Sequence, residues 1–310
     1  YLSPVRYMSH KRAMPVCGKI SMKHQAMFFK KYNNYVQCYL CAHNCRIIPG
    51  GFGICKVRKN IDGELFTFAY GMAAAAHVDP IEKKPLYHFL PKTKTFSIAA
   101  AGCNFRCRFC QNWQISQQTA ENGGTSSRLM PDDIVQAAIR SGCASISYTY
   151  TEPTVFFEYS YDTARLARQK GLRNVYVTNG YMGKEALDTI GPYLDAANID
   201  LKSFNDGFYR DICKGRLKPV LKTIERMWSK GIWIEITTLL IAGENDSSGE
   251  LRDIARFIAD IDKNIPWHIS RFHPDHKMLN ADITPMALME KAGEIGAGAG
   301  LKNVYLGNIK

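Results

Sequence analysis

The chain has 310 residues, 46% of them hydrophobic, and its 40 Lys and Arg residues against 28 Asp and Glu residues give a net charge of +12. A chain of this length can bury a sizeable core, so we expect one large α/β domain with a smaller appendage. No run of 18 apolar residues occurs, so a membrane span is not expected. The basic residues are scattered without an RNA-binding signature, so a nucleic-acid partner is not expected either.

The ten cysteines indicate metal binding more than a disulfide framework, because the chain is long and rich in strand and helix patterns. A reducing cytoplasm is therefore the expected location. Residues 1–31 are basic but lack the apolar centre of a signal peptide. Residues 1–34 as a whole show little pattern and are interpreted as a lead-in.

Residues 35–92 are predicted to form a small Cys-rich subdomain. Its four closely spaced cysteines are Cys38, Cys41, Cys45 and Cys55. Four thiolates can close a tetrahedral zinc site or hold an iron–sulfur cluster, and such a closed site would be structural or would relay electrons. Four buried cysteines or a disulfide pair remain the alternative. Further on, residues 60–65 predict a turn between two short strands, and residues 79–88 form a polar connector.

From residue 93 to 310, strand-like and helix-like segments alternate, which predicts βα units and a parallel sheet. The expected strands are 95–102, 145–150, 174–179, 198–203, 233–241, 267–272 and 303–306. Helices are expected between them, for example at 131–141, 155–170 and 251–261. Six repeats and a last strand predict the fold class: α/β, a partial (β/α)6 TIM-like barrel with a small Cys-rich N-terminal element.

The first barrel strand runs into a loop that carries Cys103, Cys107 and Cys110, spaced C-x3-C-x2-C. Three thiolates this close together can hold three corners of an iron–sulfur cubane. The fourth iron then has an open position, by the logic of a catalytic zinc site, and can chelate the amino and carboxylate groups of S-adenosylmethionine. A zinc knuckle or three unrelated core thiols are the alternatives. The strand–Gly–loop context favours the cluster.

In (β/α) barrels the chemistry lies at the carboxyl ends of the strands. Polar residues at or near the later strand ends are Tyr150, Glu152, Asn179, Tyr181, Asp200, Lys202, His268, Arg271 and His273. Each alone has an ordinary explanation: Asp200 and Lys202 share one face of a strand and can form an ion pair, and Glu152 can cap a helix. Together they supply an acceptor for an ammonium, a cation for a carboxylate and partners for ribose hydroxyls, which S-adenosylmethionine requires.

Residues 37–309 resemble the radical S-adenosylmethionine enzyme of the AmmeMemoRadiSam system, a relative of the pyruvate formate-lyase activating enzyme. The passages that carry the resemblance are CYLCAHNCRIIPGGFGICKVRKN, DPIEKKPLYHFLP, SIAAAGCNFRCRFCQNWQIS, YTYTEPT, VTNGY, NIDLKSF, TTLLIAGEND, WHISRFHPDHKM and VYLGNI. These passages identify the family, but they say much less about the substrate.

The resemblance implies a [4Fe-4S] cluster on Cys103, Cys107 and Cys110. It places S-adenosylmethionine against a set that includes the aromatic residue of the cysteine signature and the strand-end residues: Phe109, Glu152, Asn179, Asp200, Lys202 and His268. Two departures stand out. Glu152 lies in Thr-Glu-Pro where many superfamily members have Gly-Gly-Glu, and the family often continues past the final Gly-Asn with a Cys-bearing tail, whereas this chain stops at Lys310.

The expected reaction begins with one-electron reduction of the cluster by an external ferredoxin- or flavodoxin-type donor. Cleavage of S-adenosylmethionine then gives methionine and a 5′-deoxyadenosyl radical that abstracts hydrogen from a substrate. We expect a small-molecule or nucleotide substrate, handled with AmmeMemoRadiSam partner proteins and contacted by Tyr150, Tyr181, Arg271 and His273. The alternatives are an activase that makes a glycyl radical on a partner protein and, in another class, an iron–sulfur electron carrier or an RNA-binding module.

Overall fold

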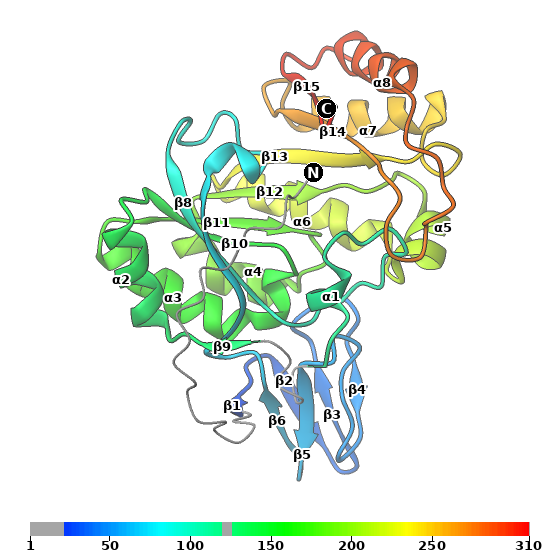
Figure 1. Cartoon of the computed structure of the whole chain (residues 1–310). Helices are drawn as coiled ribbons and strands as arrows, with labels where there is room; N and C mark the ends of the chain where they lie inside the picture. Colours follow the sequence, from blue (N-terminus) through cyan, green and yellow to red (C-terminus); the bar gives the residue numbers. More distant parts are fainter. Residues whose placement is uncertain (1–21, 120–125, 310) are drawn as a thin grey trace.

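The computed structural model describes residues 22–119 and 126–309 (Figure 1). The main element of the described chain is a nine-stranded sheet in the order β15-β14-β13-β12-β11-β10-β8-β7-β9. Its parallel strands are β8 (Lys94–Ala100), β10 (Ser145–Tyr148), β11 (Arg173–Thr178), β12 (Ala196–Asp200), β13 (Trp233–Leu240), β14 (Trp267–Arg271) and β15 (Val304–Gly307). Within the described residues the two ends of this sheet do not pair with each other, so the barrel is open.

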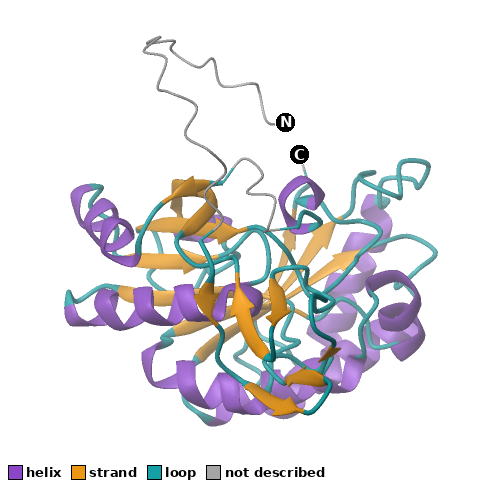
Figure 2. Cartoon of the chain, turned by 90° about the horizontal axis from the view of Figure 1, so that it is seen from below, coloured by secondary structure: helices purple, strands orange, loops and turns teal. Residues whose placement is uncertain are grey.

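Helices connect successive parallel strands and surround the sheet (Figure 2). The main ones are α2 (Pro131–Arg140), α3 (Phe157–Gln169), α4 (Lys184–Ile190), α6 (Leu217–Ser229), α7 (Ser248–Ile261) and α8 (Met286–Gly298). Shorter turns are η1 (Ile81–Lys83), α1 (Trp113–Ser116), η3 (Pro153–Phe156), η4 (Gly191–Tyr193), α5 (Asp206–Phe208) and the π-helix η5 (Tyr209–Cys213). The six crossovers and the last strand confirm the partial barrel that the sequence predicts.

Burial explains why these segments form a parallel sheet. Every residue of β10 is buried, and in β8 only Lys94 is exposed. Strands covered on both faces need such continuous apolar or small side chains, and in a barrel the helices cover the outer face while packed side chains fill the interior. The helix α7 instead buries only one stripe, formed by Leu251, Ile254, Ala255 and Ile258, whose spacing matches the helical repeat.

The N-terminal element consists of two small antiparallel sheets at the bottom of Figure 1. One contains β1 (His24–Gln25), β6 (Glu64–Thr67) and β5 (Arg58–Ile61), and the other contains β2 (Phe29–Tyr32), β3 (Tyr35–Cys38) and β4 (Arg46–Ile47). The predicted turn joins β5 and β6 through Asp62 and Gly63, whose φ angles are +52° and +83°. Two positive φ angles suit the right-handed twist of a tight hairpin.

Two features of this region differ from the sequence interpretation. The strands β1 and β2 lie in the segment interpreted as a patternless lead-in, whose residues 1–21 are outside the described residues. The strand β7 (Met72–Pro80) belongs to the large sheet, where it pairs antiparallel with β8 and with β9 (Ser127–Arg128). Its run of alanines gives a weak strand signal, because Ala is depleted in strands. The domain boundaries at residues 35 and 93 stay predictions.

A buried ion pair joins the N-terminal element to the barrel. Arg58 on β5 pairs with Glu158 on α3, and both side chains are almost fully buried. Glu158 Oε1 also accepts a 2.7 Å hydrogen bond from Met27 N, and Arg58 Nη1 donates to Met27 O at 2.7 Å. Because a buried charge without its partner is strongly unfavourable, this pair fixes how the element lies against α3.

We predict that Arg58→Met lowers the free energy of unfolding by about 3–5 kcal/mol, because it leaves the Glu158 carboxylate buried without a cation. The double variant Arg58→Met/Glu158→Gln should be less destabilised than the single variant. Urea unfolding measures both. Lys31→Met is the matched control: it breaks the solvent-exposed pair with Glu64 and should cost less than about 1 kcal/mol. Equal losses in the single and double variants would contradict the explanation.

Candidate active site

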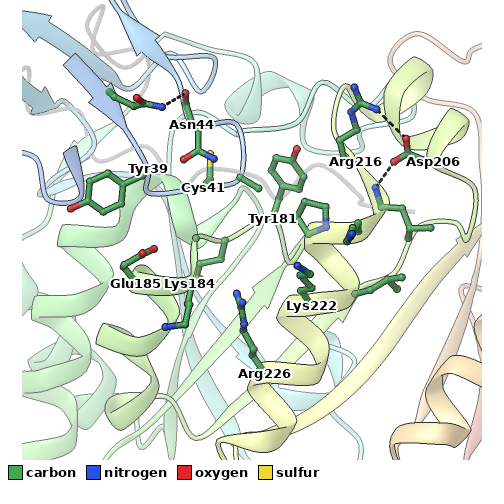
Figure 3. A pocket seen from close by; sticks show the side chains of 18 of the residues that line it. Tyr39, Cys41, Asn44, Tyr181, Lys184, Glu185, Asp206, Arg216, Lys222 and Arg226 are labelled. Atoms are coloured by element: carbon green, nitrogen blue, oxygen red, sulfur yellow. Dashed lines mark hydrogen bonds and ion pairs between the residues drawn. The ribbon is translucent and has the colours of Figure 1, made fainter. Parts of the chain in front are cut away.

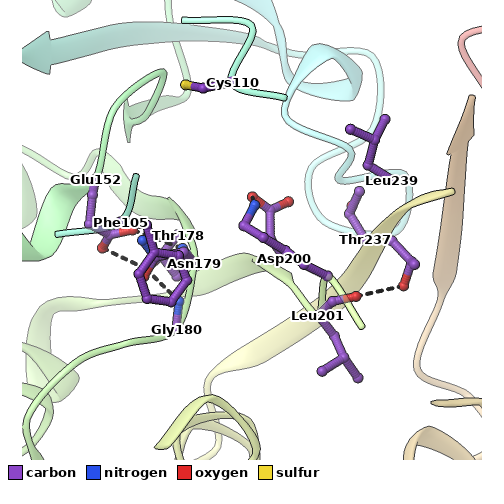
Figure 4. A network of polar contacts seen from close by, with 12 residues as sticks. Phe105, Cys110, Glu152, Thr178, Asn179, Gly180, Asp200, Leu201, Thr237 and Leu239 are labelled. Atoms are coloured by element: carbon purple, nitrogen blue, oxygen red, sulfur yellow. Dashed lines mark hydrogen bonds and ion pairs between the residues drawn. The ribbon is translucent and has the colours of Figure 1, made fainter. Parts of the chain in front are cut away.

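The carboxyl ends of the parallel strands surround a cavity of about 300 Å³. Its lining includes most of the residues that the sequence singled out: Cys103, Cys107, Phe109, Cys110, Tyr150, Glu152, Asn179, Asp200 and Lys202. Figure 4 shows Glu152, Asn179 and Asp200 at the ends of neighbouring strands, with Cys110 on the loop above them. Because these ends meet at one edge of the sheet, residues far apart in the chain share the cavity.

The cysteine loop begins at Gly102, where a side chain has no room. Its φ is +98°, and a Cβ there would lie 2.5 Å from Val57 Cγ1 and 2.9 Å from the Cys55 carbonyl oxygen. Only glycine adopts this backbone without strain and permits the contact. The loop then turns back, with Gly102 N donating to Ile115 O at 2.9 Å. The N-terminal element therefore packs directly on the base of the cysteine loop.

The loop cysteines have raised thiol pKa values in the absence of a metal. Burial raises the pKa of Cys103 well above its usual value, and burial likewise raises the pKa of Cys110. Donors are already placed near both sulfurs: Phe105 N lies 3.3 Å from Cys103 Sγ, and Ser116 Oγ lies 3.2 Å from Cys110 Sγ. Because thiolates are the metal-binding form, these cysteines would hold a cluster with loss of their thiol protons, and the two donors would stabilise the thiolates.

A fourth thiol lies beside the loop, and the sequence analysis missed it. The buried Cys213 of η5 contacts Cys107, and this hydrogen bond, together with burial, raises the pKa of Cys107. Backbone bonds hold the two segments together, since Arg106 N donates to Cys213 O at 2.8 Å. Nothing local in the sequence links Cys213 to the loop, because the contact arises only from the folding of η5 against it.

Glu152 is held by a set of donors at the wall of the cavity. Its Oε1 accepts hydrogen bonds from Thr154 N at 3.0 Å, Thr154 Oγ1 at 2.6 Å and Thr178 Oγ1 at 2.8 Å. Its Oε2 accepts from Asn179 N at 2.8 Å. Burial raises the pKa of this carboxyl, although all of these hydrogen bonds act in the opposite direction. The Asn179 side chain extends the network, because Nδ2 donates to Asn104 Oδ1 at 2.7 Å on the cysteine loop.

Asp200 and Lys202 form the ion pair expected from their spacing, with Lys202 Nζ 2.8 Å from Asp200 Oδ2. The ammonium also lies 5.7 Å from the centre of the Phe109 ring. Burial opposes the charged form, but Asp200 and the nearby thiols of Cys107 and Cys213 outweigh it and raise the pKa of Lys202. The cavity therefore contains a cation–carboxylate pair beside the cysteine loop, which matches the charges of an amino-acid group.

Two lysines that the sequence analysis treated as part of a polar connector line the same cavity. Lys83 and Lys84 each bind Asp79 at 2.8 Å, one on each carboxylate oxygen. The Tyr150 hydroxyl donates to the same carboxylate, and Lys84 Nζ lies 4.3 Å from the centre of the Tyr150 ring. Tyr150 has a φ of +64°, which is strained for a non-glycine residue. Burial opposes ionisation of Asp79, but these three donors together lower its pKa.

Four of the predicted residues do not line the cavity. His268 lies deeper in the barrel, with Nε2 2.6 Å from Glu235 Oε2 and its ring against Tyr87 and Tyr305. It shares a strand face with Ser270, which does line the cavity, but it is two residues further from the carboxyl end. The structure therefore does not bring His268 to the proposed cofactor site.

The other three are predicted substrate residues. Arg271 Nε donates to Thr284 O at 2.7 Å, and the exposed His273 contacts Gln111, a lining residue, at 2.9 Å but does not line the cavity itself. Tyr181 lies behind the cysteine loop, where its ring centre is 5.0 Å from that of Phe105. Of the four residues predicted to contact the substrate, only Tyr150 lines the cavity.

The N-terminal cysteines lie close to a second glycine, Gly53. A Cβ at Gly53 would lie 3.7 Å from Cys55 Sγ and 3.8 Å from Cys45 Sγ, so both sulfurs lie next to this glycine. Arg58 Nη1 donates to Cys38 Sγ at 3.5 Å, and burial raises the pKa of Cys41 and Cys55. All described cysteines are free, and no three His, Cys, Asp or Glu side chains in the described ranges are arranged to hold a metal ion. The site at these cysteines stays a prediction.

The chain matches the Radical SAM superfamily over residues 97–258. It is 45% identical to the Methanocaldococcus jannaschii protein MJ0808 over 287 residues, 92% of this chain and 85% of that protein. It is 25% identical to the putative glycyl-radical enzyme activating enzyme MJ1227 of the same organism, over 59% of this chain and 75% of that one. The GTP 3′,8-cyclase of Geobacter sulfurreducens is 32% identical over 51% of this chain and 49% of its own length.

Among solved structures, Streptococcus suis SuiB bound to S-adenosylmethionine aligns with a TM-score of 0.53 at 13% identity, over 66% of this chain and 48% of that one, and so shares the fold. An open parallel barrel with three cysteines at its mouth defines the class of enzyme that uses a [4Fe-4S] cluster and S-adenosylmethionine. This chain belongs to the radical SAM superfamily. None of the helices in its described part has the length and apolar content of a membrane span.

We predict that Glu152→Gln destabilises the fold by about 1–3 kcal/mol, because an amide nitrogen facing these donors leaves buried groups unsatisfied. The difference in stability between the parent and this variant should also depend on pH. Since burial raises the pKa of Glu152 from 4.5 in the folded chain, the parent binds a proton more tightly folded than unfolded. Its stability advantage over the variant should therefore fall as the pH rises from about 4 through the raised pKa.

Urea unfolding at several pH values measures both effects. Thr178→Val is the control, because it removes one donor and keeps the titrating carboxyl. An advantage that grows with pH would contradict the expected direction.

Proposed function

We propose that the chain cleaves S-adenosylmethionine reductively and uses the resulting radical to abstract hydrogen from a small anionic molecule or nucleotide. When bound to Cys103, Cys107 and Cys110, the cluster supplies one electron that breaks S-adenosylmethionine into methionine and a 5′-deoxyadenosyl radical. The observation that carries the proposal is that these three cysteines and the Asp200–Lys202 pair line one cavity. An electron carrier or an RNA-binding module would have no need of this pair or of the Glu152 network.

In this proposal the protein binds the methionine end of the cofactor by charge. Lys202 would bind the cofactor carboxylate, and Asp200 or Glu152 Oε2 would accept a hydrogen bond from its ammonium. Glu152 Oε2 has a single hydrogen bond among the described residues, so it keeps an accepting position. Asn179 orients the cysteine loop through Asn104, and Phe109 covers the Lys202 side of the cavity.

The opposite wall supports an anionic substrate. Lys83 and Lys84 bring two cations against the single carboxylate of Asp79, so this side of the cavity has an excess positive charge. A phosphate or carboxylate is the complementary group. The relatives named GTP 3′,8-cyclase, whose name specifies a nucleotide, agree with this class. Of the four residues predicted to contact the substrate, we keep Tyr150, which lines this cavity, and not Tyr181, Arg271 or His273.

A second candidate is an activase that places a glycyl radical on a partner protein. The similarity to the putative glycyl-radical enzyme activating enzyme, over 75% of that protein, favours it. The two candidates differ in what they consume, a free anion or a peptide loop. In either case we propose a cytoplasmic protein that receives its electron from a ferredoxin- or flavodoxin-type donor. AmmeMemoRadiSam proteins are the proposed further partners.

The experiment that tests the function is anaerobic reconstitution with iron and sulfide, followed by addition of S-adenosylmethionine and dithionite. We predict that the parent forms 5′-deoxyadenosine and that the triple variant Cys103→Ala/Cys107→Ala/Cys110→Ala forms none and lacks the spectrum of the catalytic cluster. The control is Cys143→Ala, which removes a buried thiol outside the cavity and should cleave normally. Cleavage by the triple variant at the parental rate would refute the proposal.

We further predict that Lys202→Ala weakens S-adenosylmethionine binding at least ~30-fold, because truncating one partner of a buried charge pair costs about 2–5 kcal/mol. The cluster should survive, since its cysteines come from another loop. Arg271→Ala is the matched control, because Arg271 lies outside the cavity. Isothermal titration of the reconstituted variants measures both. Tight binding by Lys202→Ala with weak binding by Arg271→Ala would show that the cofactor lies on the other side of the barrel mouth.

A further inference from the structure

A second, larger groove lies behind the cysteine loop. Its volume is about 1120 Å³, and it is bordered by β2, β3 and the cysteine-bearing turn of the N-terminal element, by α4 and by α6 (Figure 3). Six cations line it, against two carboxylates. The cations are Lys30, Lys184, Arg216, Lys218, Lys222 and Arg226.

Three of these cations form a row on α6. Lys218, Lys222 and Arg226 are spaced four residues apart, which places them on one side of the helix. In the described part of the chain no carboxylate pairs with any of them, whereas Arg216 pairs with Asp206 at 3.2 Å and Lys184 with Asp188 at 3.3 Å. Like charges at this spacing destabilise a helix slightly. The row therefore slightly destabilises α6 in the free protein, and an acidic partner would remove this repulsion.

The wall between this groove and the catalytic cavity is thin. Tyr181 lines the groove, Phe105 lines the cavity, and their ring centres are 5.0 Å apart. The Tyr181 ring also lies 4.8 Å from that of His43, whose Nε2 is 2.8 Å from the Asn104 carbonyl oxygen in the cysteine loop. A molecule bound in the groove is thus separated from the cysteine loop by one pair of aromatic side chains.

The N-terminal cysteines lie against the same wall. Cys41 itself lines the groove. Arg106, in the catalytic loop, donates to Cys103 O at 2.6 Å and also to the carbonyl oxygen of Ile54, the residue before Cys55. The two cysteine-bearing segments are therefore joined by side chain–backbone bonds at both His43 and Arg106. An electron that arrives at the groove would therefore be only a few residues away from both the N-terminal cysteines and the cysteine loop.

We propose that this groove docks an acidic one-electron donor protein, of the flavin or iron–sulfur class. The inference rests on the proposed function, because only a redox enzyme needs such a partner. One electron leaves the reduced centre of the donor and is gained by the iron–sulfur centre of this chain, and no proton or bond is exchanged. The uncompensated row on α6 attracts the acidic surface, and the short Tyr181–Phe105 separation makes the transfer path compact.

The test uses the reconstituted full chain and a purified reduced flavodoxin as the acidic probe. The variant is Lys218→Glu/Lys222→Glu/Arg226→Glu. Its matched control is Arg252→Glu/Arg256→Glu, an exposed pair with the same spacing on α7, away from the groove. Isothermal titration gives flavodoxin binding, and 5′-deoxyadenosine formation is followed with flavodoxin and, separately, with dithionite.

We predict that the α6 variant binds flavodoxin at least ~10-fold more weakly than the parent and loses the salt dependence of binding, as expected for a steering surface. Its dithionite-driven cleavage should match that of the parent, and the α7 control should behave as the parent in every assay. The neutral variant Lys218→Gln/Lys222→Gln/Arg226→Gln should show a smaller loss of the same kind, which guards against misfolding of the reversed-charge variant.

Unchanged flavodoxin binding in the α6 variant overturns the proposal. So does an equal loss in the α7 control, or a parent that binds a single-stranded RNA through the α6 row but does not bind flavodoxin. The proposed function fails in a distinguishable way: the parent would then give no 5′-deoxyadenosine with dithionite, whether or not flavodoxin binds.

Discussion

The contact between Gly102 and the segment of Cys55 and Val57 is the constraint on which the candidate active site depends. The chain reverses direction there at the end of a buried strand, and the absent side chain lets the N-terminal element reach the base of the cysteine loop. Any Cβ would overlap Val57, so the loop and the element must be positioned together. The buried Arg58–Glu158 pair then fixes the element on α3 from its other side. Local geometry at one glycine and one ion pair thus sets where three thiols lie.

The parts of the fold that could be predicted from the sequence are those with local signals. The buried parallel strands consist mostly of apolar and small side chains, and the three cysteines lie within eight residues, so their spacing does not depend on where the strand boundaries are drawn. Glu152, Asn179, Asp200 and Lys202 could be predicted to share one cavity, because each lies at or just after a strand end and parallel strands bring those ends together. Their contacts with a cofactor stay a prediction. His268 was predicted to lie at the same cavity, but it lies deeper in the barrel. The sequence indicates which face of the strand it occupies, whereas its depth depends on the register of β14 against β13, which places it beside Glu235.

Lys83, Lys84 and Cys213 could not be placed from local patterns. The lysines follow β7, a strand of alanines that enters the sheet antiparallel beside β8, so their position depends on a pairing without a sequence signal. Cys213 reaches Cys107 only because η5 packs on the cysteine loop. Tyr181 shows the opposite error. It follows a strand end, as a site residue should, but the backbone turns at Gly180, with φ of +70°, and the ring points behind the loop.

The cavity at the strand ends and the groove beside α6 differ in how their charges are balanced, and this difference has a physical cause. Inside the cavity Lys202 has Asp200 and Lys84 has Asp79, because a buried charge without a partner is too costly to keep. Such pairs can exchange partners with a zwitterion at little net cost, which suits the methionine end of a cofactor. Along the solvent-facing α6 row, water screens each charge and no internal partner is required. The field of these unpaired cations extends outward, so it acts on molecules that approach the surface, whereas the field of the cavity pairs acts only on what has already entered.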